Sequence, residues 1–302
     1  MQATHGTLAG YLRVTETTSL KAACPLEGGG TSEGSTCGVV SGGCLSIALG
    51  HLGDIVASDA GKGDALYGRM REYTSWFEDQ FDSTICRERC GEDLNTMPGF
   101  MKYILLGKFM SRCEVHIGKA ASQLIKLIEM PLEEEDKKSE IDERLSESGG
   151  YCASPVMRGI REATGHGSLY LEQLSVAYDG GIGLSGGLCG ALAGALMPIG
   201  LIWGLQPRAA GLIETVEFNV RGHINLYMDR REQELWSIGN PFVRDFRNKF
   251  GSLEGKDIVG RSFASGTELA EFVPGSDVCS EIKDWCRDQA MELISANTAF
   301  NR

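Results

Sequence analysis

Cysteine is the residue type in this chain best suited to chemistry, because ten cysteines occur among 302 residues. A cysteine thiolate can bind a metal or an iron–sulfur cluster, and it can also exchange with a disulfide. Ten cysteines are too many for an ordinary intracellular domain and too few, for this length, for a small disulfide scaffold. Eight of them belong to a repeated framework and are the candidate cofactor- and metal-binding residues: Cys37, Cys86, Cys90, Cys113, Cys152, Cys189, Cys279 and Cys286.

Two of these cysteines lie in segments that repeat each other. GGGTSEGSTCGVVSGG at 28–43 aligns with GGIGLSGGLCGALAGA at 180–195, which puts Cys37 over Cys189 at an offset of 152 residues. FEDQFDSTICRERCG at 77–91 aligns with FRNKFGSLEGKDIVG at 246–260, at an offset of 169. Both pairs come in the same order, so a unit of about 150 residues has been duplicated.

The alignment separates the shared cysteines from those that one copy lacks. Cys86 lies over Gly255 and Cys90 lies over Val259, so copy two has lost both thiols. The counterpart of Cys152, which opens copy two, would precede Met1. Cys24 and Cys44 lie over Val176 and Leu196, and we interpret them as additions to copy one or as inert core residues.

Each repeated Cys-Gly pair follows a glycine-rich loop and begins a run of small and apolar residues. We therefore expect Cys37 and Cys189 at helix N-termini, where the helix dipole and free N–H groups lower the pKa of a thiol below its usual value of about 8.5. Burial raises a thiol pKa, and we expect the helix terminus to outweigh it. The alternative is a buried cysteine at a close helix crossing, with the glycines serving only packing.

Apolar residues recur at helical spacing through most of the chain, and strand-like alternation is absent. The amphipathic segments are 62–81, 115–130, 211–236 and 280–296. The sequence predicts a mainly α protein made of two tandem helical repeats packed as a pseudo-dimer. We expect a first repeat at 1–130, a charged linker at 131–150 and a second repeat at 151–302.

These motifs resemble the redox-active family named for its C-GCAxxG-C-C pattern, and the resemblance covers most of the chain twice. The Cys-Gly-Ala-x-x-Gly match is complete at 189–194, whereas Val39 replaces the alanine in copy one. A related helical unit occurs in split-Soret cytochromes, where it accompanies haem and an iron–sulfur cluster. The resemblance implies that the cysteines are ligands of a [2Fe–2S] or [4Fe–4S] cluster.

Neither copy has all four family cysteines in alignment. Copy one keeps the second, third and fourth as Cys37, Cys86 and Cys113, and Cys90 could complete a four-thiolate set. Copy two has Gly255 in the third position. It keeps the first and second family cysteines as Cys152 and Cys189, and the fourth is Cys279 or Cys286. Together, Cys279 and Cys286 could complete a four-thiolate set for a second site in copy two.

The leading hypothesis is an iron–sulfur, or other thiolate–metal, redox and electron-transfer protein. One alternative is a metal-free thiol–disulfide redox protein, and another is a structural zinc or interaction module. Zinc accepts the same four thiolates and is the weaker choice of metal. No CxxCH motif is present, which argues against covalent haem. No catalytic triad, carboxylate pair or phosphate loop is readable, so whether the chain is an enzyme stays open.

The composition bears on partners and compartment. A net charge of −12 without a basic run argues against nucleic-acid binding. Residues 180–207 carry no charge and are long enough to cross a bilayer, but Pro198 interrupts them and the matching stretch of copy one contains Glu33. We expect a buried core helix there and no membrane span. No signal peptide is readable, so we expect a cytoplasmic protein with a redox partner protein, and a homodimer is a candidate assembly.

Overall fold

A computed structural model describes residues 1–14, 17–57, 62–133, 140–206, 212–230 and 233–298. Within these residues the chain is built of helices, with two isolated β-bridges and no strand. The predicted mainly α fold is therefore confirmed. Copy one contains α1 (Gln2–Tyr11), α2 (Thr18–Ala22), α3 (Gly38–Gly50), α4 (Leu52–Ala57), α5 (Gly63–Phe81), α6 (Cys86–Cys90), α7 (Met97–Leu105) and α8 (Glu114–Glu129).

The second half repeats this order after a ninth helix. It contains α9 (Glu140–Ser148), α10 (Ala153–Thr164), α11 (Leu169–Leu174), α12 (Gly190–Trp203), α13 (Leu212–Tyr227), α14 (Leu235–Phe250), α15 (Gly255–Val259), α16 (Gly266–Phe272) and α17 (Asp277–Thr298). Short 3-10 turns lie at Cys24–Leu26 and Ser175–Tyr178, and a π-helical turn, η2, at Phe109–Cys113.

The two helices that follow the Cys-Gly cysteines, α3 and α12, form the centre of the molecule. Both are apolar on all sides, and nearly every residue of each is buried, as expected for a helix with no polar face. The uncharged segment at 180–207 thus contains a core helix. No helix in the described part of the chain has the length and apolar character needed to span a membrane.

The two glycine-rich loops have the same backbone conformation. Residues 28–34 and 180–186 adopt left-handed φ angles at six matched positions, including +76° at Gly29 and +79° at Gly181. A Cβ on Gly29 would lie 2.3 Å from the Ser35 nitrogen, and a Cβ on Gly181 would clash with the backbone in the same way. Glycine is required at these two positions because the chain folds back on itself there.

Each loop leads into one β-bridge, and the two bridges are equivalent. Thr36 pairs with Ile85 in copy one, and Leu188 pairs with Glu254 in copy two. These pairs are related by the offsets of 152 and 169 residues found in the sequence. The structure therefore confirms the alignment in which Cys37 matches Cys189 and Cys86 matches Gly255.

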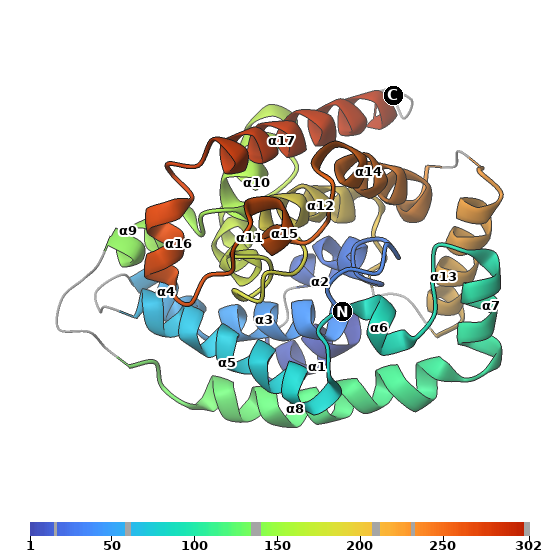
Figure 1. The fold of residues 1–302 in the computed structure, drawn as a ribbon, viewed down its shortest axis with the longest axis horizontal. Helices are drawn as coiled ribbons and strands as arrows, with labels where there is room; N and C mark the ends of the chain where they lie inside the picture. Colours follow the sequence, from blue (N-terminus) through green and yellow to red (C-terminus); the bar gives the residue numbers. More distant parts are fainter. Residues whose placement is uncertain (15–16, 58–61, 134–139, 207–211, 231–232, 299–302) are drawn as a thin grey trace.

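The two copies pack about a pseudo-twofold axis that passes between Thr36 and Leu188. These residues are equivalent in the repeat, and they contact each other: the Leu188 N–H donates to the Thr36 hydroxyl oxygen at 2.7 Å. Direct contact between equivalent residues is a property of a twofold axis. The predicted pseudo-dimer is therefore confirmed, and Figure 1 shows α3, α5 and α8 on one side and α10, α12, α14 and α17 on the other.

Elements also cross from each copy to the other. In Figure 1, α16 of copy two reaches α5 of copy one, and α7 of copy one lies beside α13 of copy two. The loops cross as well, since Thr31 packs against Gly239 of α14, while Gly183 packs against Met70 of α5. Each copy therefore contributes helices and loop residues that pack against the core of the other copy.

The segment predicted as a charged linker contains a packed helix. Ile141 and Leu145 of α9 are buried, and the Asp142 carboxylate accepts the N–H groups of Lys62 and Gly63 at 2.9 and 2.7 Å. These are donors that the start of α5 leaves without an intrahelical partner. The segment thus stabilises the N-terminus of α5 in addition to joining the two copies.

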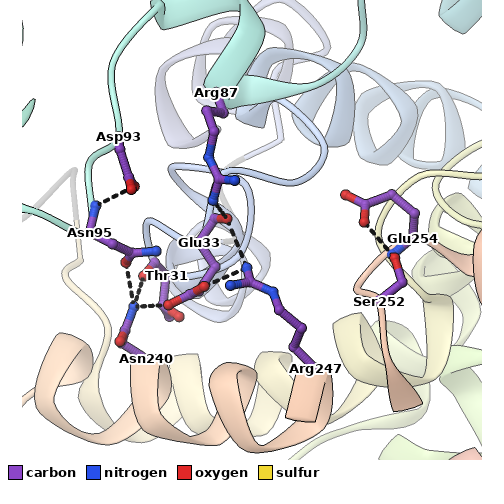
Figure 2. A network of polar contacts seen from close by, with 9 residues as sticks. All are labelled: Thr31, Glu33, Arg87, Asp93, Asn95, Asn240, Arg247, Ser252 and Glu254. Atoms are coloured by element: carbon purple, nitrogen blue, oxygen red, sulfur yellow. Dashed lines mark hydrogen bonds and ion pairs between the residues drawn. The ribbon is translucent and has the colours of Figure 1, made fainter.

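A polar network ties the loop of copy one to α14 of copy two (Figure 2). The Glu33 carboxylate is 2% exposed and forms an ion pair with Arg247. The Asn240 amide donates to the carbonyl of Thr31 at 2.8 Å, to Glu33 at 3.1 Å and to Asn95 at 2.9 Å. One buried side chain therefore binds three acceptors from copy one.

Replacing Asn240 with leucine should lower the free energy of unfolding by about 1–3 kcal/mol, because the variant leaves buried acceptors without donors. Urea denaturation followed by circular dichroism measures this loss. The matched control is Arg71→Met, at the equivalent position of α5, where a partly exposed side chain donates to the Phe263 carbonyl at 3.0 Å. Equal losses for the two variants would contradict a special role of the Asn240 network.

Candidate thiol sites

The four predicted thiols of copy one come together from three segments of the chain. Cys37 precedes α3, Cys86 and Cys90 are the first and last residues of α6, and Cys113 ends η2. The pKa of Cys86 is raised well above its usual value by a hydrogen bond with Cys90, by burial, and by the charges of Cys37, Cys90 and Cys113. The Cys86 sulfur is thus within electrostatic reach of the other three.

The backbone of the glycine loop holds Cys37 and Cys86 beside each other. The Cys37 N–H donates to the Thr84 carbonyl at 2.7 Å, and the Cys86 N–H donates to the Ser35 carbonyl at 2.6 Å. Each bond joins one cysteine to the residue two positions before the other cysteine, so main-chain geometry fixes the spacing of the two backbone segments that carry the thiols.

Cys86 and Cys90 form an unequal pair. They lie one turn apart on α6, and the Cys86 thiol hydrogen-bonds to the Cys90 sulfur, which lowers the pKa of Cys90 to about 7 despite burial. As a thiol, Cys90 donates to the carbonyl of Glu92 at 3.1 Å. Near neutral pH in the metal-free protein, Cys90 is therefore the thiol of this group that ionises first.

The predicted lowering of the pKa of Cys37 and Cys189 is wrong. Both cysteines do occupy the N-cap positions of α3 and α12, and backbone N–H groups at the start of each helix favour the thiolates. Burial outweighs this effect and raises the pKa of each thiol to about 11. The desolvation penalty dominates because the loops and helices surround most of each side chain, although Cys189 stays partly exposed.

Tyr103 contacts the copy-one thiols and was not predicted. Its hydroxyl lies 3.2 Å from the Cys113 sulfur. Burial raises the pKa of Tyr103 far above its usual value, and the charge of Cys113 adds to this, so the phenol remains a hydrogen-bond donor. The repeat offered no signal for this contact, because Phe272 occupies the equivalent position in copy two.

Three of the predicted copy-two thiols, Cys152, Cys189 and Cys279, line one pocket. Each is partly exposed, and the pKa of Cys152 is raised by burial and then by the charges of Asp179, Cys189 and Cys279. Cys286 is fully buried and lies outside the pocket, although the charge of Cys189 contributes to its raised pKa. Of the two candidates for the fourth family cysteine, Cys279 is the one that reaches this pocket.

Apolar residues in copy two replace three of the copy-one thiols. Gly255 and Val259 stand at the positions of Cys86 and Cys90. Ile282 stands at the position of Cys113, because His116 and Trp285 make equivalent ring contacts with Phe81 and Phe250. Gly255, Val259 and Ile282 all line the copy-two pocket.

The first family cysteine has no counterpart within copy one. Gly42 packs against the Met1 carbonyl as Gly194 packs against the Ala153 carbonyl, so Met1 matches Ala153. The position equivalent to Cys152 directly precedes Met1, in agreement with the sequence prediction. Cys24 and Cys44 are fully buried in the core, and burial raises the pKa of both thiols.

No group of three or more His, Cys, Asp or Glu side chains is arranged to hold a single metal ion in the part of the chain that the structure describes. The cofactor and its ligand set therefore remain predictions. The ten cysteines are all free thiols, so none is committed to a disulfide.

Comparison with known proteins gives the family. The family model described as "Putative redox-active protein (C_GCAxxG_C_C)" matches residues 1–127 and 150–293. The chain belongs to this family. The two matches fall on the two copies, in agreement with the duplication. No curated protein and no solved structure matches the chain. The resemblance found in the sequence is thereby confirmed, and redox activity is the function described for the family.

Removing the thiol donor of Cys86 should raise the pKa of Cys90. In the reduced, metal-free protein, Cys86→Ala leaves the Cys90 thiolate buried without its hydrogen bond, and burial then disfavours the charged form. The pH dependence of alkylation at Cys90, followed by mass spectrometry, measures the shift. Cys86→Ser keeps a donor and should give a smaller rise. A Cys90 pKa that stays near 7 in Cys86→Ala would show that the pair does not set it.

Proposed function

We propose that copy one carries an electron-transfer centre in which Cys37, Cys86, Cys90 and Cys113 hold an iron–sulfur cluster. The observation that carries this proposal is the convergence of four thiols from three segments. Four thiolates are what a [2Fe–2S] or [4Fe–4S] cluster requires, and a cluster accepts wider sulfur spacing than one metal ion. When bound, the cluster supplies one-electron chemistry.

The electrostatics of this group suit thiolate ligation. Without a metal, burial and mutual repulsion keep three of the thiols protonated, since the pKa values of Cys37, Cys86 and Cys113 are all raised. A cationic centre would offset both costs. The N–H groups of Val39 and Val40 point at the Cys37 sulfur and the Tyr103 hydroxyl lies against Cys113. Such hydrogen bonds to ligand sulfur tune a reduction potential.

Zinc would take the same four thiolates but has no redox chemistry. The family description as redox-active therefore favours iron–sulfur over a structural zinc site. We place the protein in a reducing, cytoplasmic setting, with which ten free thiols are compatible. Lys108 is paired with Glu92, whereas Arg89 adjoins Cys90 in the chain and the charge of Arg112 acts on Cys113. The charge of these two arginines favours an acidic redox partner protein.

Protein purified without oxygen should contain iron and acid-labile sulfide and absorb visible light. Cys86→Ala and Cys113→Ala should each lose most of the iron, because a ligand is removed. Cys24→Ala and Cys44→Ala are matched controls from outside the thiol groups and should keep it. Wild-type protein without iron, or with zinc alone, would contradict the proposal.

Copy two should not hold a cluster of its own, because Gly255 replaces the third family cysteine. A Cβ on Gly255 would have no neighbour closer than 3.6 Å, so a β-carbon fits at this position without a clash. We expect Cys189→Ala to leave the iron and sulfide counts unchanged and Gly255→Cys to raise them. Unchanged counts in Gly255→Cys would show that the missing thiol is not what keeps copy two empty.

A second candidate function, thiol–disulfide exchange, is favoured by the hydrogen bond between Cys86 and Cys90. The Cys90 thiolate would attack a partner disulfide and release one partner sulfur as a thiolate. Cys86, having lost its proton, would then attack the Cys90 sulfur, release the second partner thiolate and close a Cys86–Cys90 disulfide. Two electrons pass from the pair to the partner. Metal-free protein that forms this disulfide reversibly, as read by loss of the two thiol hydrogens, would support this function.

A further inference from the structure

The copy-two pocket, defined above by Cys152, Cys189 and Cys279, has walls of a different character from the copy-one site. Side chains from α15, α16 and α17 form them, and these include Val259, Leu269 and Ile282. Concave apolar surfaces with a few polar groups are typical of small-molecule sites. The thiols occupy part of the lining, and most of the remaining lining residues are apolar.

Several apolar residues of the pocket wall occupy positions where copy one has thiols or a charged side chain. Val259 and Ile282 stand at the positions of Cys90 and Cys113, and Ile258, another lining residue, stands at the position of Arg89. Gly255 leaves empty the space that the Cys86 side chain fills in copy one. Loss of metal binding alone would not require apolar residues at these positions. In a pocket that binds an apolar group, each of them would contact the ligand.

The charged groups at the pocket are all positive. Lys256 and Lys283 line it, and neither forms an ion pair with a described residue. Arg261 also lines it but is held by Glu268 at 3.2 Å and stacks on Phe263. The described lining contains no Asp or Glu. An anionic group is therefore attracted to this pocket and a cationic one is repelled.

We infer that the copy-two pocket binds a small carboxylate with an apolar tail, the carboxylate held by Lys256 and Lys283 and the tail by the apolar walls next to the thiols. Cys152 and Cys189 do not oppose an anion, because burial raises the pKa of both thiols. This site goes beyond the copy-one redox centre, and it depends on the proposal above only in that copy two holds no cluster.

Isothermal titration of the full-length protein with hexanoate tests the inference. We expect saturable binding of one hexanoate per chain, at least about tenfold weaker binding of hexylamine, and protection of Cys189 and Cys279 from iodoacetamide. Lys256→Gln with Lys283→Gln should weaken hexanoate binding by about tenfold or more. Lys249→Gln, a lysine outside the pocket, is the charge-matched control and should bind as wild type does.

Filling the pocket gives a second readout. Gly255→Leu should abolish hexanoate binding, and Val259→Phe serves the same purpose if the first variant does not fold. Absence of saturable binding, equal binding of hexylamine, or full binding by the lysine double variant would overturn the inference. Iron and sulfide are counted on the same samples. Iron without hexanoate binding rejects only the pocket, and hexanoate binding without iron rejects only the redox centre.

Discussion

The conformation of the two glycine-rich loops is the constraint on which the rest of the molecule depends. Six matched residues in each loop are left-handed, and the loop closes on itself so tightly that Gly29 and Gly181 have no room for a side chain. Each loop then forms a β-bridge that holds its Cys-Gly cysteine against the third family position. The same loop packs on the other copy. The conformation of the glycine-rich loop therefore sets both the position of the Cys-Gly thiol and the packing of one copy against the other.

The two thiol sites show how one backbone supports two chemistries. In copy one the backbone brings four thiols together, and burial and repulsion make the thiolates costly without a positive centre. In copy two the same backbone carries three thiols in an open pocket, with isoleucine and valine where copy one has cysteine. At the loops and bridges the two copies differ in side chains and not in backbone conformation, because the φ angles and the bridge pairs match.

The fold was predictable because a repeat constrains far more than composition does. The matched motifs indicated the duplication, the pseudo-dimer and the equivalence of Cys37 and Cys189, whereas the amphipathic segment predicted at 211–236 contains the end of α13 at Tyr227 and the start of α14 at Leu235. The thiol pKa values were not predictable, because they depend on how completely the loops exclude water, which no spacing reports. Tyr103 and the buried face of α9 were missed for a related reason. Both contacts occur in one copy only, so the repeat gives no sign of them. The positive charges of the copy-two pocket were missed because they come from residues that are far apart in the sequence.

The contact between Thr36 and Leu188 on the axis has a consequence for the history of the molecule. An assembly of two identical chains would carry every substitution at both sites at once, so a change that disabled one site would disable both. Joining the copies in one chain removed that obligation. Gly255 and Ile282 could then arise on one side of the axis while Cys86 and Cys113 were kept on the other. Because the two copies are covalently linked, the two sites of a symmetric fold could acquire different side chains and different chemistry.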